Sequence, residues 1–348
     1  MSASTPRRIL VIGPSWVGDM VMAQTLFSAL HQRHPGCVVD VLAPDWSRPI
    51  LDRMPEVNRA LSLPFAHGEL RFGERRGLGR QLRDQYDQSI VLPNSLKSAL
   101  LPWWARVPVR TGWRGEMRYG LLNDLRLLDK DALPLMVQRF VALALPPDAP
   151  VPALADISAP HLQVDPAEVS RALSDQGLQQ GRPVTALCPG AEFGPAKRWP
   201  ERHYAAVAAA RIAAGGQVWI FGSGNDVPVA EAIRDAVPDD ARAHVHVLAG
   251  RTSLAQAVDL MSCADAVVTN DSGLMHIAAA LGRPLVAVYG STSPAFTPPL
   301  GEQVEVVRLG LSCSPCFERE CPLGHLDCLN TLEPRRVLDA LERLQGGH

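Results

Sequence analysis

Short apolar runs alternate with helical patterns along most of the chain. In the first part of the chain the apolar runs are 9–12, 38–42, 57–63 and 89–92, and helical periodicity occupies 19–33, 46–53 and 78–85. After residue 165 the helical stretches are 166–176, 201–214, 227–236, 253–263 and 333–344, and the apolar runs are 184–188, 217–221, 245–248, 264–269 and 304–307. Such alternation predicts α/β domains, each a doubly wound parallel sheet.

Prolines crowd into residues 146–160, which have no apolar period, and they predict a linker. We therefore expect two Rossmann-like domains, at 1–155 and 156–330, followed by a terminal helix within 331–348.

The most informative unit is 264–290, where a β-branched run stops at Asn-Asp-Ser-Gly and a helical pattern and a second apolar run follow. Asp271 and Ser272 are good helix N-caps, and Gly273 permits close approach of the backbone. A phosphate is well placed at such a helix start, and His276 can face the same ligand. The alternative is an ordinary capped strand-helix-strand unit without a ligand.

Composition limits the class of protein. The chain has 348 residues, of which 47% are hydrophobic and 20% charged, as in globular proteins of about two domains. The formal net charge of −2 gives no global basic field, so we expect no nucleic-acid partner. The apolar run that starts at Ile9 is short and no long apolar span follows, which predicts a cytoplasmic protein without a membrane span.

One segment of the first domain is strongly basic. Between Arg71 and Arg118 there are ten Lys and Arg residues against four acids. The segment is either a solvated face or a groove for an anionic acceptor near a membrane surface. Trp103 and Trp104 within it either anchor at an interface or pack in the core.

The candidate acceptor contacts are Arg75, Arg76, Lys97 and Arg118. Arg75 and Arg76 fall among glycines, which predicts a loop that can close over the acceptor.

Loops at strand ends carry the candidate chemistry. Asp19 follows the loop 13–18, where its carboxylate can take the proton of an attacking hydroxyl or, alternatively, can only cap the first helix. In the second domain Lys197, the pair Gly222 and Ser223, and the 271–276 stretch suit a diphosphate and its nucleoside. One positioned carboxylate and a diphosphate pocket favour inverting sugar transfer over hydrolysis, which generally needs two carboxylates.

Three segments resemble the lipopolysaccharide heptosyltransferase II family, within glycosyltransferase family 9. They are GPSWVGDMVMAQTL at 13–26, CPGAEFGPAKRWP at 188–200 and NDSGLMHIAAALGRPLVAVYGSTSPAFTPPL at 270–300. The resemblance implies a GT-B fold whose two domains face each other across a cleft, with the last helix crossing back to the first domain. It also implies transfer of L-glycero-D-manno-heptose from ADP-heptose to the first heptose of the inner core on Hep-Kdo2-lipid A. The implied reaction needs no cofactor. Whether the enzyme makes peripheral contact with the inner membrane stays open.

By the same resemblance, Asp19 matches the catalytic base. The residues that match the donor site are Ser15, Gly18, Lys197, Asp271, Ser272, Gly273, Leu274 and His276.

Four cysteines cluster near the end of the chain. Cys313, Cys316, Cys321 and Cys328 enclose His325, and the set either holds a structural Zn²⁺ or consists of reduced cysteines packed in a loop. The spacing matches no common zinc signature, so we predict no bound metal.

Two other function classes stay open. A sugar-nucleotide epimerase of similar architecture needs no acceptor groove, and a non-catalytic nucleotide-sugar binding protein has no use for Asp19. The basic segment and Asp19 favour the transferase.

Overall fold

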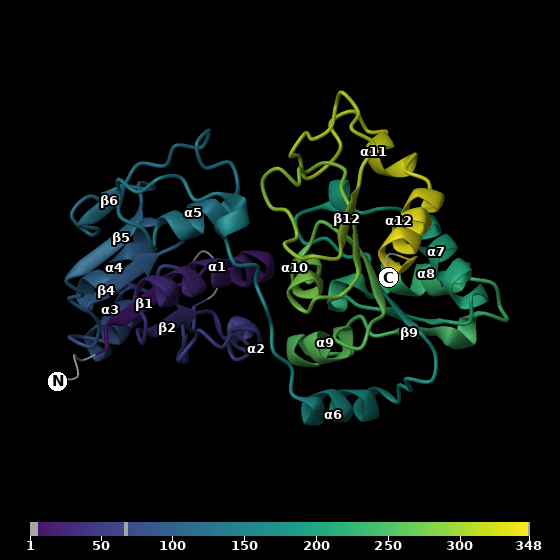
Figure 1. Ribbon diagram of the computed structural model, residues 1–348, viewed down its shortest axis with the longest axis horizontal. Helices are drawn as coiled ribbons and strands as arrows, with labels where there is room; N and C mark the ends of the chain where they lie inside the picture. Colours follow the sequence, from purple (N-terminus) through teal and green to yellow (C-terminus); the bar gives the residue numbers. More distant parts are fainter. Residues whose placement is uncertain (1–5, 66–68, 347–348) are drawn as a thin grey trace. The chain divides into compact units, whose positions relative to one another are not determined.

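The computed structural model describes residues 6–65 and 69–346. The chain forms two compact units, Met1–Pro160 and His161–His348, and each is built on a six-stranded parallel sheet over the described residues (Figure 1). The predicted domain boundary, between 155 and 156, lies a few residues before the boundary between these units. The predicted cleft between the domains stays a prediction.

The sheet of the first unit has the order β3-β2-β1-β4-β5-β6. Its strands are β1 (Arg8–Ile12), β2 (Val38–Ala43), β3 (Arg59–Ser62), β4 (Gln88–Val91), β5 (Val109–Trp113) and β6 (Asp124–Arg126). Its helices are α1 (Val17–Arg33), α2 (Arg48–Leu51), α3 (Phe72–Gln81), α4 (Leu96–Trp104) and α5 (Met136–Ala142). Helix α1 packs against α2 and α5, whereas α3 packs against α4.

The basic segment is more ordered than the sequence pattern predicts. Helix α3 begins at Phe72 and spans the glycines that predicted a loop, and α4, β5, β6 and α5 have no counterpart among the predicted elements. Gly79 explains part of this, because a Cβ there would lie 2.7 Å from Trp104 Cβ. The glycine lets α3 and α4 pack closely and is not a loop residue.

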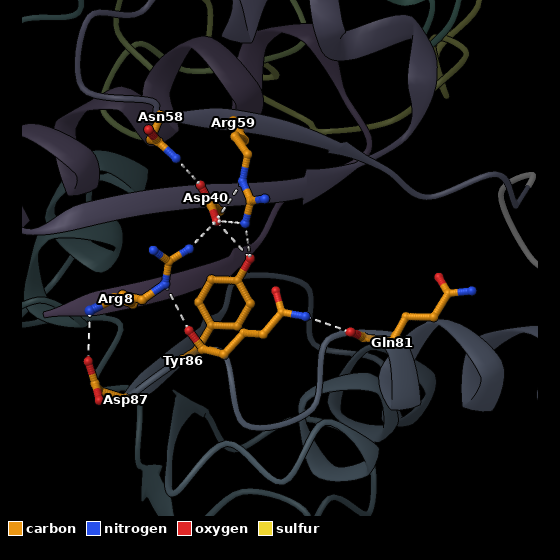
Figure 2. Close-up of polar contacts among 8 residues, drawn as sticks. Arg8, Asp40, Asn58, Arg59, Gln81, Tyr86 and Asp87 are labelled. Atoms are coloured by element: carbon orange, nitrogen blue, oxygen red, sulfur yellow. Dashed lines mark hydrogen bonds and ion pairs between the residues drawn. The ribbon is translucent and has the colours of Figure 1, made fainter.

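An ionic network around the buried Asp40 of β2 includes Arg8 and Arg59, the first residues of β1 and β3 (Figure 2). Asp40 is fully buried on β2 and accepts hydrogen bonds from Arg59 Nη2 at 2.6 Å, Asn58 Nδ2 at 2.8 Å and the Tyr86 hydroxyl at 2.7 Å. Arg8 Nη2 lies 3.6 Å from the same carboxylate. Ligands of open α/β sheets bind at the carboxyl ends of the strands, so this network at the opposite edge is structural.

The sheet of the second unit has the order β12-β11-β10-β7-β8-β9. Its strands are β7 (Val184–Cys188), β8 (Gln217–Ile220), β9 (Val245–Val247), β10 (Ala266–Asn270), β11 (Leu285–Val288) and β12 (Val304–Val307). Its helices are α6 (Pro166–Gln176), α7 (Glu201–Ala213), α8 (Val227–Ala236), α9 (Leu254–Met261), α10 (Gly273–Ala280), α11 (Asp327–Asn330) and α12 (Pro334–Gly346). In Figure 1, α7, α8 and α12 lie on one side of this sheet and α9 and α10 on the other. This is the predicted doubly wound arrangement.

Helix α12 packs on the second unit. Val337, Ala340 and Leu341 are fully buried in its core, and the helix contacts α7, β11 and β12. The implied contact of this helix with the first unit stays a prediction.

Candidate active site

The second unit brings its candidate residues together where the strand order reverses. Strands β7 and β10 are neighbours there, and the loops after them hold Lys197 and Asp271. Lys197 Nζ lies 2.6 Å from Asp271 Oδ2, and both side chains are largely buried, with 16% and 7% exposed. The Thr292 hydroxyl donates to the same oxygen at 2.6 Å, and the ammonium also lies 5.2 Å from the centre of the Phe193 ring. The result is a fixed cation at the carboxyl edge of the sheet, the usual ligand position.

Asn270 ties the two loops together, although the sequence did not single it out. Its side chain is fully buried and accepts hydrogen bonds from the Trp199 backbone N–H at 3.1 Å and the Tyr204 hydroxyl at 3.0 Å. Its amide donates to the Pro189 carbonyl at 2.6 Å. Since Asn270 ends β10 and precedes Asp271, it sets the position of the Lys197 loop relative to the start of α10. The only hint in the sequence is a polar residue that ends an otherwise apolar strand.

The start of α10 is not capped by its own side chains. Ser272 occupies the N-cap position but makes no capping hydrogen bond, and its hydroxyl lies 3.3 Å from Thr269 Oγ1. The prediction that Asp271 and Ser272 cap the helix is therefore wrong, because Asp271 pairs with Lys197 instead. The first N–H groups of any helix lack intrahelical acceptors, so those of Gly273 and Leu274 are placed to bind an anion.

His276 is buried one turn into α10. Burial lowers its pKa to about 4; the Asp271 carboxylate opposes this shift and the Lys197 ammonium adds to it. The imidazole is neutral at neutral pH and can donate one hydrogen bond, not two.

Gly222 and Ser223 form a closed local structure with Asp226. The Ser223 hydroxyl and backbone N–H both donate to Asp226 Oδ2, at 2.8 and 2.9 Å. A Cβ at Gly222 would lie 2.7 Å from Asp226 Cβ, and one at Gly190 would lie 2.6 Å from its carboxylate. These glycines leave room for the Asp226 side chain beside the loops after β7 and β8, and a donor contact by Gly222 or Ser223 stays a prediction.

In the first unit Asp19 lies in the first turn of α1 and is half-buried. Trp16 occupies the N-cap position without a side-chain hydrogen bond to the helix, so Gly18 and Asp19 are the second and third residues of the helix. A carboxylate there is stabilised by the helix dipole, which fits both the predicted catalytic base and the structural alternative.

A cavity of about 490 Å³ lies at the carboxyl ends of β1 and β4, where the strand order of this sheet reverses. Ser15 from the loop after β1, Asn94 from the loop after β4, and Lys97 from α4 line it. Trp46 and Phe65 supply apolar walls. Ser15 therefore lines this cavity of the first unit, and its predicted contact with the donor stays a prediction.

The four predicted acceptor contacts occupy different environments. Lys97 lines the cavity, and so does Arg75, but Arg75 is only 4% exposed and donates to the carbonyls of Leu70 and Glu69. Arg76 is exposed on helix α3, which corrects its predicted place in a loop.

Arg118 is 1% exposed. Its guanidinium donates to the carbonyl oxygens of Trp113 and Pro93, the latter at 2.6 Å. Arg118 thus holds the backbone together, which corrects its predicted place in the acceptor groove.

Trp104 is buried, as core packing predicts, whereas Trp103 is 45% exposed.

The four clustered cysteines line one small cavity of about 20 Å³ together with His325. All are free thiols, and no group of three or more His, Cys, Asp or Glu side chains in residues 6–65 and 69–346 is arranged to hold a metal ion. The absence of a bound metal remains a prediction. Among the described residues, no helix is both long and apolar enough to cross a membrane.

Two Rossmann-like units, each built on a six-stranded parallel sheet, match the heptosyltransferase structures of the GT-B type. The chain belongs to glycosyltransferase family 9 (heptosyltransferase), whose family model matches residues 75–327. This confirms the predicted fold class, enzyme class and family.

Similar proteins are known over the full length. The chain is 52% identical to lipopolysaccharide heptosyltransferase 2 of Salmonella typhimurium over 345 residues, which covers 97% of this chain and 98% of that one. A solved structure of E. coli ADP-heptose lps heptosyltransferase II matches with a TM-score of 0.87 and 49% identity, covering 98% of this chain and 100% of that one. A family 9 glycosyltransferase from Veillonella parvula has the same fold, with a TM-score of 0.84 at 19% identity and full coverage of both chains.

Proposed function

We propose that this protein transfers L-glycero-D-manno-heptose from ADP-heptose to the first heptose of the inner core on Hep-Kdo2-lipid A. The relatives named above, with about half of their residues identical, support these substrates. The observation that carries the donor side is the Lys197–Asp271 pair beside the uncapped start of α10. A cation and free helix N–H groups at one sheet edge suit a diphosphate.

In the proposed reaction the acceptor hydroxyl attacks the anomeric carbon of heptose, and the bond from that carbon to the diphosphate oxygen breaks with its electron pair leaving on ADP. Asp19 takes the hydroxyl proton, as a general base does. Lys197 and the N–H groups of Gly273 and Leu274 stabilise the charge that develops on the leaving diphosphate. Attack from the face opposite the diphosphate inverts the anomeric configuration.

The cavity of the first unit is the proposed acceptor site. Its apolar walls suit the face of a sugar ring, and Lys97 suits an anionic group such as a Kdo carboxylate. Because the acceptor is linked to a lipid, we propose that the enzyme works in peripheral contact with the inner-membrane surface.

The test is to incubate the protein with ADP-heptose, with and without the heptosylated Kdo2-lipid A acceptor, and to measure ADP release and the fate of the sugar. Release of ADP that depends on the acceptor supports the transferase. Conversion of the sugar nucleotide without acceptor indicates an epimerase, and binding without turnover indicates a sensor; either result contradicts the proposal.

A further inference from the structure

Helices α3 and α4 of the first unit carry exposed aromatic side chains. Phe72 on α3 is 53% exposed and Trp103 on α4 is 45% exposed. Both rest on the buried Trp104: the rings of Phe72 and Trp104 are edge-on with centroids 4.8 Å apart, and those of Trp103 and Trp104 are 6.3 Å apart. The two exposed rings are therefore neighbours held on one rigid support, not scattered surface residues.

Exposed arginines flank these rings. Arg76 follows Phe72 by one helical turn and Arg80 follows by two, so the three side chains share one side of α3. Arg106 lies just beyond Trp103 at the end of α4. All three arginines are exposed, and none makes an ion pair within the described part of the chain. We call these five residues the aromatic-basic face.

We propose that the aromatic-basic face docks the enzyme on an anionic lipid bilayer. The Trp103 ring is stable at the headgroup level, where its apolar part is buried and its indole N–H stays wet, and Phe72 adds an apolar ring that can insert beside it. Arginines beside them attract acidic headgroups, so the charge of the face is complementary to that of an anionic leaflet. A face with both features is typical of proteins that lie on a membrane without spanning it.

The same two helices line the cavity of the first unit. Arg75 lies next to Arg76 in the chain but lines the cavity, and α4 contributes Lys97 and Leu101 to its wall. Docking through the outer sides of α3 and α4 would hold the cavity close to the headgroup layer, where the sugars of a lipid-linked acceptor are found. This consequence rests on the proposed function, whereas the docking itself does not.

The direct test is sedimentation with vesicles of phosphatidylcholine, with or without phosphatidylglycerol. The variant Arg76→Gln/Arg80→Gln/Arg106→Gln should bind the anionic vesicles on the order of a hundredfold more weakly, and raised salt should weaken the wild type similarly. The variant Phe72→Ser/Trp103→Ser should lose about tenfold even at constant charge. Tyr119→Ser, which removes an aromatic ring that is 65% exposed outside this face, is the matched control and should bind like the wild type.

Turnover separates docking from sugar recognition. The aromatic variant should keep wild-type turnover on a deacylated, water-soluble acceptor and should lose turnover on the acceptor embedded in vesicles. Unchanged vesicle binding by both variants, or equal losses on both acceptors, would overturn the proposal. So would light scattering that shows a wild-type dimer and a monomeric aromatic variant, because a second copy would then cover the face. If the wild type turns over neither acceptor, the proposed function fails, and the vesicle-binding result still decides the docking.

Discussion

The Lys197–Asp271 pair allows structural and functional roles to be separated. Lys197→Met keeps most of the side-chain stem but, among the described residues, leaves the buried carboxylate of Asp271 with only the Thr292 hydroxyl as a side-chain donor. Breaking a buried ion pair by removing one partner costs about 3 to 5 kcal/mol, and we expect about 3 kcal/mol here because Thr292 still donates. The double variant Lys197→Met/Asp271→Asn should recover most of this loss, because no unpaired charge remains.

ADP affinity should respond differently. A hydrogen bond to a charged group contributes about 1.5 to 3 kcal/mol, so both variants should bind ADP roughly 10- to 150-fold more weakly than the wild type. Asp271→Asn alone frees the ammonium and should leave ADP affinity equal or higher. Urea denaturation gives the free energy of unfolding, and titration calorimetry gives the dissociation constant of ADP. If the double variant regained both stability and ADP affinity, Lys197 would act only as the partner of Asp271, and the diphosphate assignment would be refuted.

The remaining predictions concern single positions. Asp19→Asn should lower kcat by about 10² or more while the dissociation constant of ADP stays unchanged, and a loss of only a few-fold would make Asp19 a helix-stabilising residue. Lys97→Gln should raise the acceptor KM, and more so at low salt, because Lys97 lines the cavity. Arg118→Gln should instead lower the melting temperature, because buried carbonyls lose their donor. Equal effects of the two substitutions on KM and on melting temperature would contradict these separate roles. Asn270→Ala should raise the ADP-heptose KM more than the acceptor KM, as measured by kinetics with each substrate varied in turn. Equal changes in the two KM values would show that the loop after β10 is positioned without Asn270. Burial alone would raise the pKa of Asp40, but its hydrogen bonds lower the pKa by more. The contribution of Asp40 to the free energy of unfolding is therefore fully present above its pKa of about 4 in the unfolded chain, and it is lost as the pH falls through its lower pKa in the folded protein. Acid unfolding of Asp40→Asn should accordingly show lower stability near neutral pH and a weaker dependence on pH below about 4, and parallel curves for variant and wild type would exclude this role.

The sequence predicted the parts of the fold that local patterns control. Apolar runs bounded by polar turns predicted every strand of the second unit. The inner strands β7, β8, β10 and β11 are buried throughout and therefore largely apolar, whereas the edge strands β9 and β12 are partly exposed but still rich in Val. Segment 96–142 was missed, since Pro102 lies inside α4 and the helix is too short for a clear period. Gly79 misled the prediction of α3. A glycine is needed at this position because the side chain of Trp104 lies close to it, and Trp104 is distant in the sequence.

The candidate site was predictable at the level of loops but not of contacts. Lys197 and Asp271 could be placed at strand ends from the chain alone, yet their ion pair depends on how the loops after β7 and β10 fold against each other. Charge counting gave Arg118 and Arg76 equal weight in the acceptor groove. Only the structure distinguishes them, because one is buried among carbonyls and the other is exposed.

The mass and anomeric configuration of the product test the proposed transfer of one heptose with inversion. Purified enzyme, ADP-heptose and Hep-Kdo2-lipid A should give a product heavier by a single heptose, with an anomeric configuration opposite to that of the donor in its NMR spectrum. Omission of either substrate, or an acceptor that lacks the first heptose, should give no such product. A product with retained configuration, or addition of heptose directly to Kdo, would contradict the account.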